Sequence, residues 1–511
     1  MYTPSLKKFL KLTNKGNVIP VYKEINADLD TPVSAYLKVC KGDDYSFLFE
    51  SVEGREKIAR YSFLGNNPSL IFKGRGRNIR ITYPRKKRTL SFVTRGTPLD
   101  EIKKIMRDFN SVAVPGGLPR FYGGLVGYIG YDTVRFFENI PDRNPDDLKV
   151  SDTVLILADT LLIFDRLNHT IKIVANCLLP KGAAGLSRKE KISIYQKAVK
   201  RIESIHKDFD RSFIEKEPRP GCRRIKPQLS SNVKKGEFCR MVKAAKDYIK
   251  KGDVIQVVLS QRFKIKIKKE PFEIYRTLRS LNPSPYMFFL KLKEISLIGA
   301  SPEMLVRCEE GLMQTRPIAG TRPRGKTPIK DKRLENELIN DAKEKAEHLM
   351  LVDLGRNDLG RVSETGRVRV SEFMNVEKYS HVMHLVSEVR GTLDKKRFDI
   401  YDVLRAAFPA GTVTGSPKIR AMEIIDELEN IRRGPYAGCV GYFSFSHNMD
   451  TCITIRTILV KGQNAYVQAG SGIVADSLPE REYAESVNKA KAMIEAVSED
   501  ISYGVRRRRT T

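Results

Sequence analysis

The sequence predicts an α+β fold in which a mixed β-sheet core is covered on the outside by helices. Strand-like and helix-like patterns follow one another without the regular strand–helix–strand order of a doubly wound sheet. The chain has 511 residues, of which 41% are hydrophobic, enough to bury a large core. The longest apolar stretch, Val154 to Phe164, contains Asp159 and is too short to cross a bilayer.

The N-terminal region, residues 1–210, is expected to be rich in β-strands. Short apolar alternations after Tyr61 and from Asn78 to Thr82 are broken by Gly, Asn and Pro, which is typical of antiparallel strands. Residues 189–206 then show helical periodicity. The passage 211–235 is polar and contains Pro and Gly, so it is predicted to be a linker.

Residues 236–500 form a second region, and a basic tail follows at 501–511. The second region opens near the linker with a helix at about 235–251, which Gly252 closes, and a long strand from Val254 to Ile267 comes next. The apolar face of that helix consists of Phe238, Val242, Ala245 and Ile249. Further strands are predicted at 286–292, 296–300, 440–445, 451–460 and 465–469, and further helices at 334–351, 417–428 and 478–497.

The net charge of +30 raises the possibility of a nucleic-acid-binding protein. However, Lys and Arg are spread along the chain, with local runs only at Lys86–Arg88 and Arg506–Arg509. A solvated basic surface, which would also attract a small polyanionic substrate, is therefore favoured over nucleic-acid binding.

The cysteines and the N-terminal residues indicate the cellular compartment of the protein. Seven scattered cysteines show no CxxC spacing, as expected for reduced thiols. The first residues lack the apolar segment of a signal peptide. We therefore expect a cytoplasmic protein that does not enter a membrane.

The glycine cluster from Gly123 to Gly130 suggests a phosphate-binding loop at first sight. The strand–turn–helix frame and the downstream acidic residue that such a loop requires are not evident. The aromatic residues in and around the cluster instead predict packed strands.

Two glutamate pairs have helical spacing, Glu344 with Glu347 and Glu482 with Glu485, so the members of each pair share a helix face. The apolar stripes expected opposite them are Leu338, Ala342, Ala346 and Leu349 in the first helix, and Tyr483, Val487, Ala490 and Ile494 in the second. Such charges usually form only a solvated face. If the two helices faced each other, however, the carboxylates could supply the oxygen ligands that Mg²⁺ prefers.

His381 and His384 also stand at helical spacing, without a third ligand that would indicate zinc. A structural role and a proton-transfer role both remain open for them. Clusters of Gly, Thr and Pro near 316–325, 411–418 and 468–474 expose backbone N–H groups beside small hydroxyls, a way of binding carboxylates.

Taken in order, several segments resemble the chorismate-utilising enzyme family, strongly over about 232–497 and more weakly over 18–165. They are Gly299-Ala-Ser-Pro-Glu-Met, Pro317-Ile-Ala-Gly-Thr-Arg-Pro-Arg-Gly, Glu347-His-Leu-Met-Leu-Val-Asp-Leu-Gly-Arg-Asn-Asp, Gly411-Thr-Val-Thr-Gly-Ser-Pro-Lys and Gln468-Ala-Gly-Ser-Gly-Ile-Val-Ala-Asp-Ser. The resemblance implies the α+β fold of that family and an enzyme that acts on chorismate, a cyclohexadiene with two carboxylates.

The resemblance also implies roles for individual residues. Glu347 and Glu485 match ligands of Mg²⁺, and Glu344 and Glu482 match carboxylates that support it through water. His384 matches a residue near the departing C4 hydroxyl, and Glu303 matches one that handles protons around ammonia. The positions that match substrate-holding residues are Gly320, Thr321, Thr412, Tyr436, Arg456, Gly470, Ser471 and Gly472.

Two positions distinguish branches of the family. Branches that add water carry a lysine where this chain has Gln256, and 4-amino-4-deoxychorismate synthases usually carry a lysine where it has Ala319. These differences favour the branch that converts chorismate and ammonia to anthranilate and pyruvate in tryptophan biosynthesis. The 4-aminating enzyme of the folate pathway is the alternative.

The resemblance further implies regulation and a partner. Ser51, Pro285, Tyr286 and Met287 match a site at which L-tryptophan inhibits the enzyme. The chain shows no cysteine flanked by glycines of the kind a glutaminase uses. Ammonia derived from glutamine would therefore come from a separate amidotransferase subunit.

Overall fold

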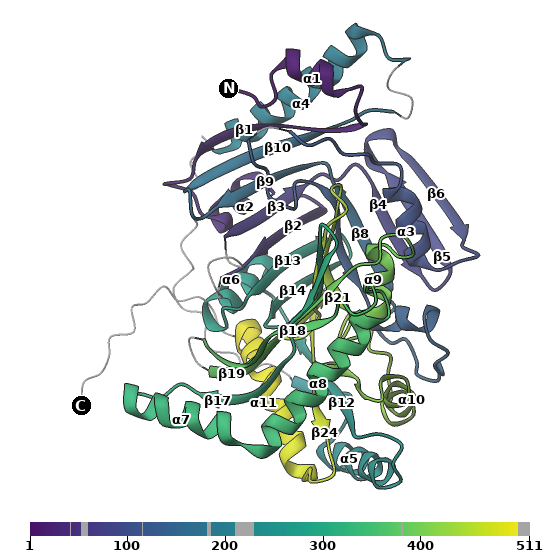
Figure 1. Ribbon diagram of the computed structural model, residues 1–511, viewed down its shortest axis with the longest axis vertical. Helices are drawn as coiled ribbons and strands as arrows, with labels where there is room; N and C mark the ends of the chain where they lie inside the picture. Colours follow the sequence, from purple (N-terminus) through teal and green to yellow (C-terminus); the bar gives the residue numbers. More distant parts are fainter. Residues whose placement is uncertain are drawn as a thin grey trace.

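The structure of the protein, a computed structural model, describes residues 1–40, 42–52, 60–114, 116–180, 185–209, 229–379 and 382–498. Most of the predicted linker, His381 and the basic tail at 501–511 lie outside these ranges. The α+β class is confirmed, with helices packed around β-sheets (Figure 1).

Two twelve-stranded sheets organise the described residues. The first runs in the order β1 (Val18–Asn26), β10 (Thr170–Leu178), β9 (Thr160–Asp165), β3 (Tyr61–Asn66), β2 (Tyr45–Glu50), β13 (Tyr286–Leu292), β14 (Ile295–Ser301), β23 (Thr457–Lys461), β24 (Asn464–Ile473), β12 (Gln256–Lys266), β11 (Leu229–Ser231), with β20 (Gly415–Ser416) also on β12. The second runs β17 (Ile318–Pro323), β19 (Val382–Thr392), β16 (Leu312–Thr315), β15 (Met304–Glu309), β22 (Met449–Ile453), β21 (Cys439–Ser444), β7 (Gly124–Ile129), β8 (Thr153–Ala158), β4 (Ile71–Arg75), β5 (Asn78–Tyr83), β6 (Arg88–Val93), with β18 (Arg369–Lys378) also on β19.

All ladders between these strands are antiparallel, where the sequence predicted a mixed sheet. The physical reason is the lack of regular helical crossovers, because a parallel pair needs such a connection between its strands.

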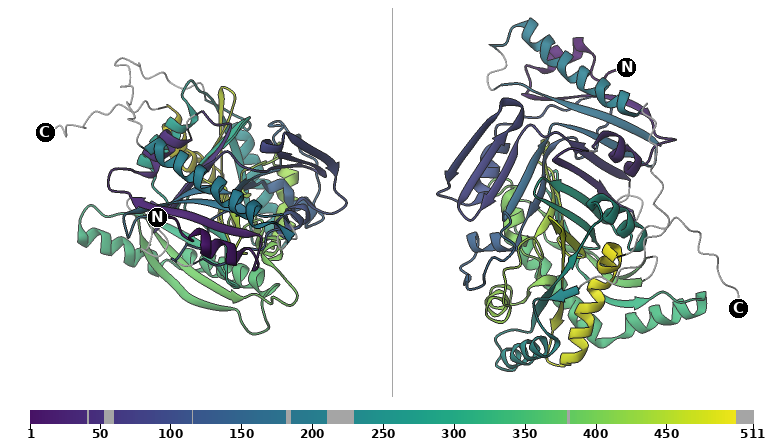
Figure 2. Two further views of the ribbon diagram at one scale, coloured as in Figure 1. Left: turned by 90° about the horizontal axis from the view of Figure 1, so that it is seen from above. Right: turned by 180° about the vertical axis from the view of Figure 1, so that it is seen from behind.

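Both sheets are shared by the N-terminal and C-terminal regions. Strand β2 pairs with β13, with Phe49 opposite Phe288, and β7 pairs with β21, with Gly127 opposite Gly441. In Figure 1 the purple N-terminal strands accordingly lie beside teal strands of the second region, and the view from behind in Figure 2 agrees. The two regions therefore contribute to common cores rather than to separate ones.

The glycine cluster forms a buried strand, as predicted, rather than a phosphate loop. A Cβ at Gly124 would lie 2.1 Å from the Phe443 oxygen, and one at Gly127 would lie 2.0 Å from the Val154 oxygen. Glycine is required here because the neighbouring strands approach too closely for a side chain.

Helices cover the outer faces of the sheets; four of the five predicted helices are confirmed, and five further helices in the described residues were not predicted. The helices are α1 (Leu6–Leu12), α2 (Pro32–Val39), α3 (Pro98–Met106), α4 (Arg188–Phe209), α5 (Lys235–Lys250), α6 (Pro271–Leu281), α7 (Pro328–Asn340), α8 (Ala342–Gly360), α9 (Ile400–Ala407), α10 (Lys418–Leu428) and α11 (Pro479–Ser498). The single helix predicted at 334–351 is wrong. Asp341 separates α7 from α8, because its backbone is extended and its side chain accepts from the N–H groups of Lys343 and Glu344.

The single strand predicted at 451–460 is also wrong, since β22 and β23 are separate strands. The chain between them includes Arg456, which adopts a left-handed backbone with φ of 51°. This turn carries one of the residues predicted to bind substrate.

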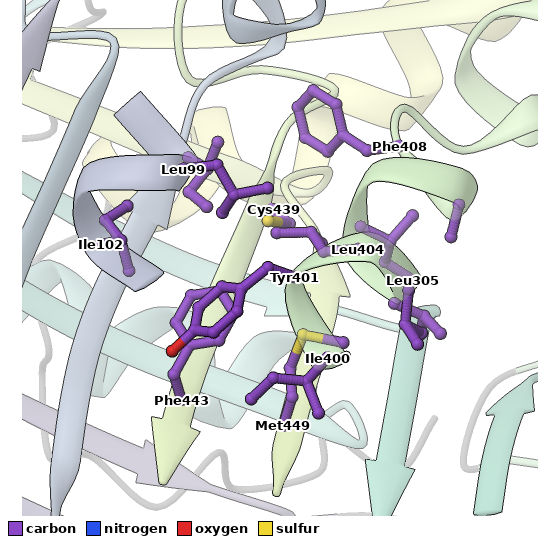
Figure 3. Close-up of a cluster of buried hydrophobic side chains, with 14 of the residues drawn as sticks. Leu99, Ile102, Leu305, Ile400, Tyr401, Leu404, Phe408, Cys439, Phe443 and Met449 are labelled. Carbon is purple, nitrogen blue, oxygen red and sulfur yellow. The ribbon is translucent and has the colours of Figure 1, made fainter. Parts of the chain in front are cut away.

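A large aliphatic and aromatic core lies between α9 and the second sheet (Figure 3). The rings of Tyr401 and Phe443 stack with centroids 5.2 Å apart, and Leu404 is fully buried beside them. We expect Leu404→Ala to lower the free energy of unfolding by about 2–5 kcal/mol, because the cavity left behind loses contacts as well as hydrophobic burial. Urea denaturation measures this loss, and a change below about 1 kcal/mol would show that the core around α9 repacks.

The described cysteines and helices bear on the predictions about thiols and membranes. The six described cysteines are free, and five of them are buried. Within the same ranges, no helix combines the length and the apolar character that a membrane span requires.

Candidate active site

Helix α8 turns Glu344 and Glu347 toward the protein rather than toward solvent. The buried residues of the helix define its inner face, and both glutamates are half-buried next to that face. The predicted apolar stripe is wrong, because three of its members, Ala342, Ala346 and Leu349, are exposed. The inner face consists of His348, Leu351, Val352, Gly355 and Leu359. Half-buried carboxylates on the inner side of a helix make these two glutamates candidates for a functional site.

Helix α11 supplies the second pair. Glu482 is buried with 9% exposure, and Ser471 on the adjacent β24 donates to its backbone oxygen at 3.3 Å. Glu485 is more exposed and pairs with Lys489 one turn later at 2.7 Å.

The carboxylates of the two helices act on one another. Burial raises the pKa of Glu347, and the charges of Glu344, Glu485 and Glu482 add to this rise against the opposing charge of Lys343. Burial likewise raises the pKa of Glu482, and Glu485 adds to it. The hypothesis that the two helices face each other is therefore consistent with the structure. A divalent cation would relieve the repulsion in such a cluster.

The carboxylates of α8 and α11 are the candidate ligands of Mg²⁺. No three His, Cys, Asp or Glu side chains within the described ranges are close enough to form a metal site from protein ligands alone. Mg²⁺ usually takes only one or two carboxylates and completes its octahedron with water and substrate oxygens. Glu347 and Glu485, with Glu344 and Glu482 nearby, fit that requirement.

His384 lies on strand β19, so its spacing from His381 does not reflect a helix. Its Nδ1 lies 3.0 Å from the backbone oxygen of Gly320 and 3.1 Å from Thr321 Oγ1. A carbonyl can only accept, so Nδ1 carries the proton and Nε2 is the basic nitrogen. Partial burial lowers the pKa of His384, so its ring is neutral at pH 7.

A bulge brings the histidine and β17 together. The register of β17 on β19 shifts between Ala319 and Thr321, and Gly320 has φ of +64°. A Cβ at Gly320 would lie 3.2 Å from Glu344 Oε2. The bulge therefore connects His384 to the carboxylates of α8.

Arg456, in the turn between β22 and β23, is a further residue of this candidate site. Its Nη1 donates to the backbone oxygen of Lys489 at 2.7 Å. Partial burial lowers its pKa, while Tyr436 and Glu485 oppose this effect. Burial raises the pKa of Tyr436 to about 12, so its phenol remains protonated at neutral pH. Arg456 thus provides a cation near both the Tyr436 phenol and Glu485, and such a cation suits the binding of an anionic substrate.

Lys489 is a site residue that the sequence reasoning missed. Its Nζ donates to the backbone oxygen of Gly470 at 3.1 Å and pairs with Glu485. The available signal was its position four residues after Glu485, on the same helix face.

Glu303, just before β15, lies close to Thr412. Burial raises the pKa of Glu303 to about 8, and Thr412 and Lys489 oppose the rise. Thr412 Oγ1 is nevertheless buried without a well-formed hydrogen bond to any described residue. A buried hydroxyl left unsatisfied at such a position suits a ligand.

The glycines of β24 allow close approach to β12. Gly470 lies opposite Ser260, and Gly472 lies opposite Val258. A Cβ would lie 2.4 Å from the Leu259 oxygen at Gly470, and 2.2 Å from Gln256 Nε2 at Gly472. The Gln256 amide therefore packs against this motif, and its buried Oε1 has no hydrogen-bond partner in the part of the chain that the structure describes.

The four residues predicted to bind tryptophan line a separate cavity with about 630 Å³ of empty space, part of it open to solvent. They are Ser51, Pro285, Tyr286 and Met287. The wall also contains Arg307, which pairs with Asp450 at 2.7 Å, and Asp450 accepts from the Tyr286 hydroxyl at 3.0 Å. The cavity combines apolar walls with buried opposite charges where strands of the two regions meet.

Known proteins resemble this chain in sequence and in structure. A family model described as chorismate binding enzyme matches residues 46–495. Anthranilate synthase component 1 of Aquifex aeolicus (strain VF5) is 49% identical over 96% of this chain and 97% of its own length. The protein of that name from Acetivibrio thermocellus is 46% identical over 98% of this chain and 99% of its own length.

Solved structures show the same fold. The crystal structure of anthranilate synthase component I from Streptococcus pneumoniae TIGR4 matches with a TM-score of 0.74 and 36% identity, over 92% of this chain and 99% of that one. The menaquinone-specific isochorismate synthase from Escherichia coli matches with a TM-score of 0.68 and 18% identity, over 96% and 98% of the two chains. The second match bears on the fold alone.

Proposed function

This chain belongs to the chorismate binding enzyme family, and on that basis we propose that it is the chorismate-converting component of an anthranilate synthase. The observation that carries the proposal is the convergence of Glu347, Glu485, His384 and Arg456 on one site. Relatives named anthranilate synthase component 1, similar over nearly the whole chain, support the same reaction.

The reaction adds ammonia at C2 of chorismate, expels the C4 hydroxyl, eliminates pyruvate and leaves an aromatic ring. Glu347 and Glu485 would hold Mg²⁺, with Glu344 and Glu482 supporting it through water, and the cation would offset the charge of the ring carboxylate. Arg456 pairs with a substrate carboxylate through its planar fork of donors, and Tyr436 and Thr412 donate hydroxyl groups. Gly320, Thr321 and the segment from Gly470 to Gly472 hold the substrate through backbone groups and small hydroxyls.

Two groups handle protons in this proposal. His384, neutral in the free protein, gains a proton when the two substrate carboxylates raise its pKa, and it then donates to the departing C4 hydroxyl. Glu303, with a pKa of about 8, accepts a proton from the attacking nitrogen.

Gln256 bears on the identity of the nucleophile. A glutamine amide is not a base, so a water molecule beside it would not be activated. Ala319 on β17 likewise lacks a charge. Gln256 therefore favours ammonia over water as the nucleophile. Ala319 favours attack at C2 over amination at C4.

An assay of anthranilate fluorescence with purified protein, chorismate, Mg²⁺ and excess ammonium at alkaline pH tests the proposal. Fluorescence that disappears with EDTA is expected. Consumption of chorismate to an amino compound without fluorescence would favour the 4-aminating alternative, and no consumption would contradict the proposed function. Activity with glutamine should require an added amidotransferase subunit.

We also propose that the separate cavity binds L-tryptophan as an inhibitor. Ser51 is 7% exposed at the cavity wall, and Arg166 fixes its backbone oxygen at 2.7 Å, so a larger side chain there would enter the cavity. We expect Ser51→Leu to raise the tryptophan concentration for half-inhibition at least about tenfold, by loss of roughly 1.4 kcal/mol or more of binding. The uninhibited rate should stay within about twofold. Inhibition curves of the two proteins measure this, and unchanged inhibition would place the tryptophan site elsewhere.

A further inference from the structure

A buried ion pair that the proposed mechanism does not use lies beside the substrate-holding segments. Arg433 and Glu429 are 2% and 5% exposed, and Glu429 directly follows α10. Arg433 Nε donates to Glu429 Oε2 at 2.9 Å, and Nη2 donates to Oε1 at 2.6 Å. This is a fully enclosed, two-pronged contact between a guanidinium and a carboxylate.

Polar atoms of the pair also bind two other segments of the chain. Arg433 Nη1 donates to the Val413 oxygen and Nη2 donates to the Val258 oxygen, each at 2.7 Å. Glu429 Oε1 accepts from both N and Oγ of Ser260 at 2.8 Å. Val413 adjoins Thr412, and Ser260 lies opposite Gly470, so the pair connects two predicted parts of the substrate site.

The pair also contacts a third part of that site, the Tyr436 ring. The guanidinium carbon of Arg433 lies 5.6 Å from the centroid of Tyr436 and 4.9 Å from that of Tyr131. Arg433, Tyr436 and Thr454 also line a small cavity beside the ring. Close packing therefore does not hold Tyr436 on every side, and the guanidinium is one of the contacts that fix it.

The energetics of the pair suggest that its contribution is geometric. A buried ion pair rarely stabilises a fold more than apolar residues of the same size would, because both charges must be desolvated. Four of the five N–H donors of Arg433 meet fixed acceptors, which leaves the side chain little freedom to adopt another arrangement. It therefore determines where its partners lie relative to one another.

We propose that the Arg433–Glu429 pair is a positioning element for chorismate, which holds Thr412, Tyr436 and Gly470 in one arrangement without touching the reacting atoms. The inference rests on the proposed function and extends it to residues outside the site itself. Loss of the pair should displace the hydroxyl groups that face the substrate, and displacements near 1 Å can cost about 100-fold in rate.

The test uses the full chain with Arg433→Lys, which keeps the charge but loses the planar fork. Glu429→Gln, which preserves shape and an acceptor for Ser260, replaces it if the first variant does not fold. We expect kcat/KM for chorismate to fall about 10- to 100-fold with a raised KM. The Mg²⁺ concentration for half-maximal activity should not change.

Asp426→Asn is the matched control. Asp426 lies on the same helix, is 5% exposed and accepts from Arg135 at 2.6 Å and from the Arg143 N–H at 3.2 Å, none of which belongs to the substrate site. Its unfolding temperature should fall to a similar extent, while its kcat/KM stays within about twofold of the wild type. An equal loss of activity in this control would overturn the proposal, since the effect would then follow stability alone.

A double substitution tests the route through Tyr436. In a Tyr436→Phe background the hydroxyl is already absent, so Arg433→Lys should cost at least about threefold less than it does alone. Costs that simply multiply would overturn the proposal.

Chorismate binding, measured by calorimetry on the same proteins, separates this inference from the proposed function. If the wild type binds chorismate but forms no anthranilate, the proposed function fails, and the Kd values of the variants still decide the positioning role. If the wild type does not bind chorismate, both are overturned.

Discussion

Replacing Glu347 or Glu485 by glutamine is expected to lower the Mg²⁺-dependent kcat/KM at least about 100-fold, with the fold intact. An amide keeps the shape of the side chain but lacks the charge that would hold the cation. Steady-state anthranilate fluorescence over a range of Mg²⁺ concentrations measures the loss.

The same variants carry a second expectation that a merely damaged protein would not meet. The glutamates of α8 and α11 repel one another, and burial raises the pKa of Glu347. Removing one charge relieves this repulsion, so without Mg²⁺ Glu347→Gln should unfold at the same temperature as the wild type or higher. Added Mg²⁺ should stabilise the wild type but not the variant.

Glu337→Gln is a suitable control for these measurements. Glu337 lies on the neighbouring α7 and pairs with Arg333 at 3.1 Å on an exposed surface. Its activity should match that of the wild type. Near-normal Mg²⁺-dependent activity in Glu347→Gln or Glu485→Gln would show that the ligands are assigned wrongly.

Glu303→Gln is expected to lower kcat about 100- to 10,000-fold, because it removes a group proposed to accept a proton. Glu303 must be ionised for this role, and burial raises its pKa to about 8. Wild-type activity should therefore rise with pH and level off above about 8. Rates are expressed per concentration of unprotonated ammonia, so that titration of the nucleophile does not contribute. If the activity of the variant showed the same inflection with pH, the inflection would belong to the titration of another group.

Stability should show the opposite dependence on pH. A carboxyl group whose pKa is raised on folding is stabilising while protonated, and this contribution is lost as pH rises through the folded pKa of about 8. Glu303→Gln stays neutral at every pH. Its unfolding temperature relative to the wild type should therefore be higher at pH 9 than at pH 5, and calorimetry at the two values measures this.

Several features of the candidate site depend on patterns that the sequence shows directly. The helical spacing of Glu344 with Glu347 and of Glu482 with Glu485 was visible in the chain, since period alone determines which residues share a helix face. The glycines at 320, 470 and 472 were also visible, and their close approaches to Glu344, the Leu259 oxygen and Gln256 explain why no side chain fits there.

The direction in which those helix faces point was not visible. Charges opposite apolar residues normally face solvent, and this rule predicted the wrong stripe for α8, where Leu349 is 47% exposed. The rule fails on α8 because this helix half-buries Glu344 and Glu347 and leaves Leu349 exposed, a departure from local patterning that is expected at functional sites. Similarly, nothing in the local pattern placed Lys489 beside Gly470 or Arg433 beside Val258, since these contacts join residues that are 19 and 175 positions apart in the chain.

The sequence by itself determined the α+β class, part of the helices and strands, and the identities of the residues that could perform chemistry, because these depend on periodicity and on side-chain type. Only the tertiary structure decided that both regions share each sheet and that four glutamates from two helices interact. These features depend on long-range antiparallel pairing and on electrostatics between segments more than a hundred residues apart, which no local window of sequence contains.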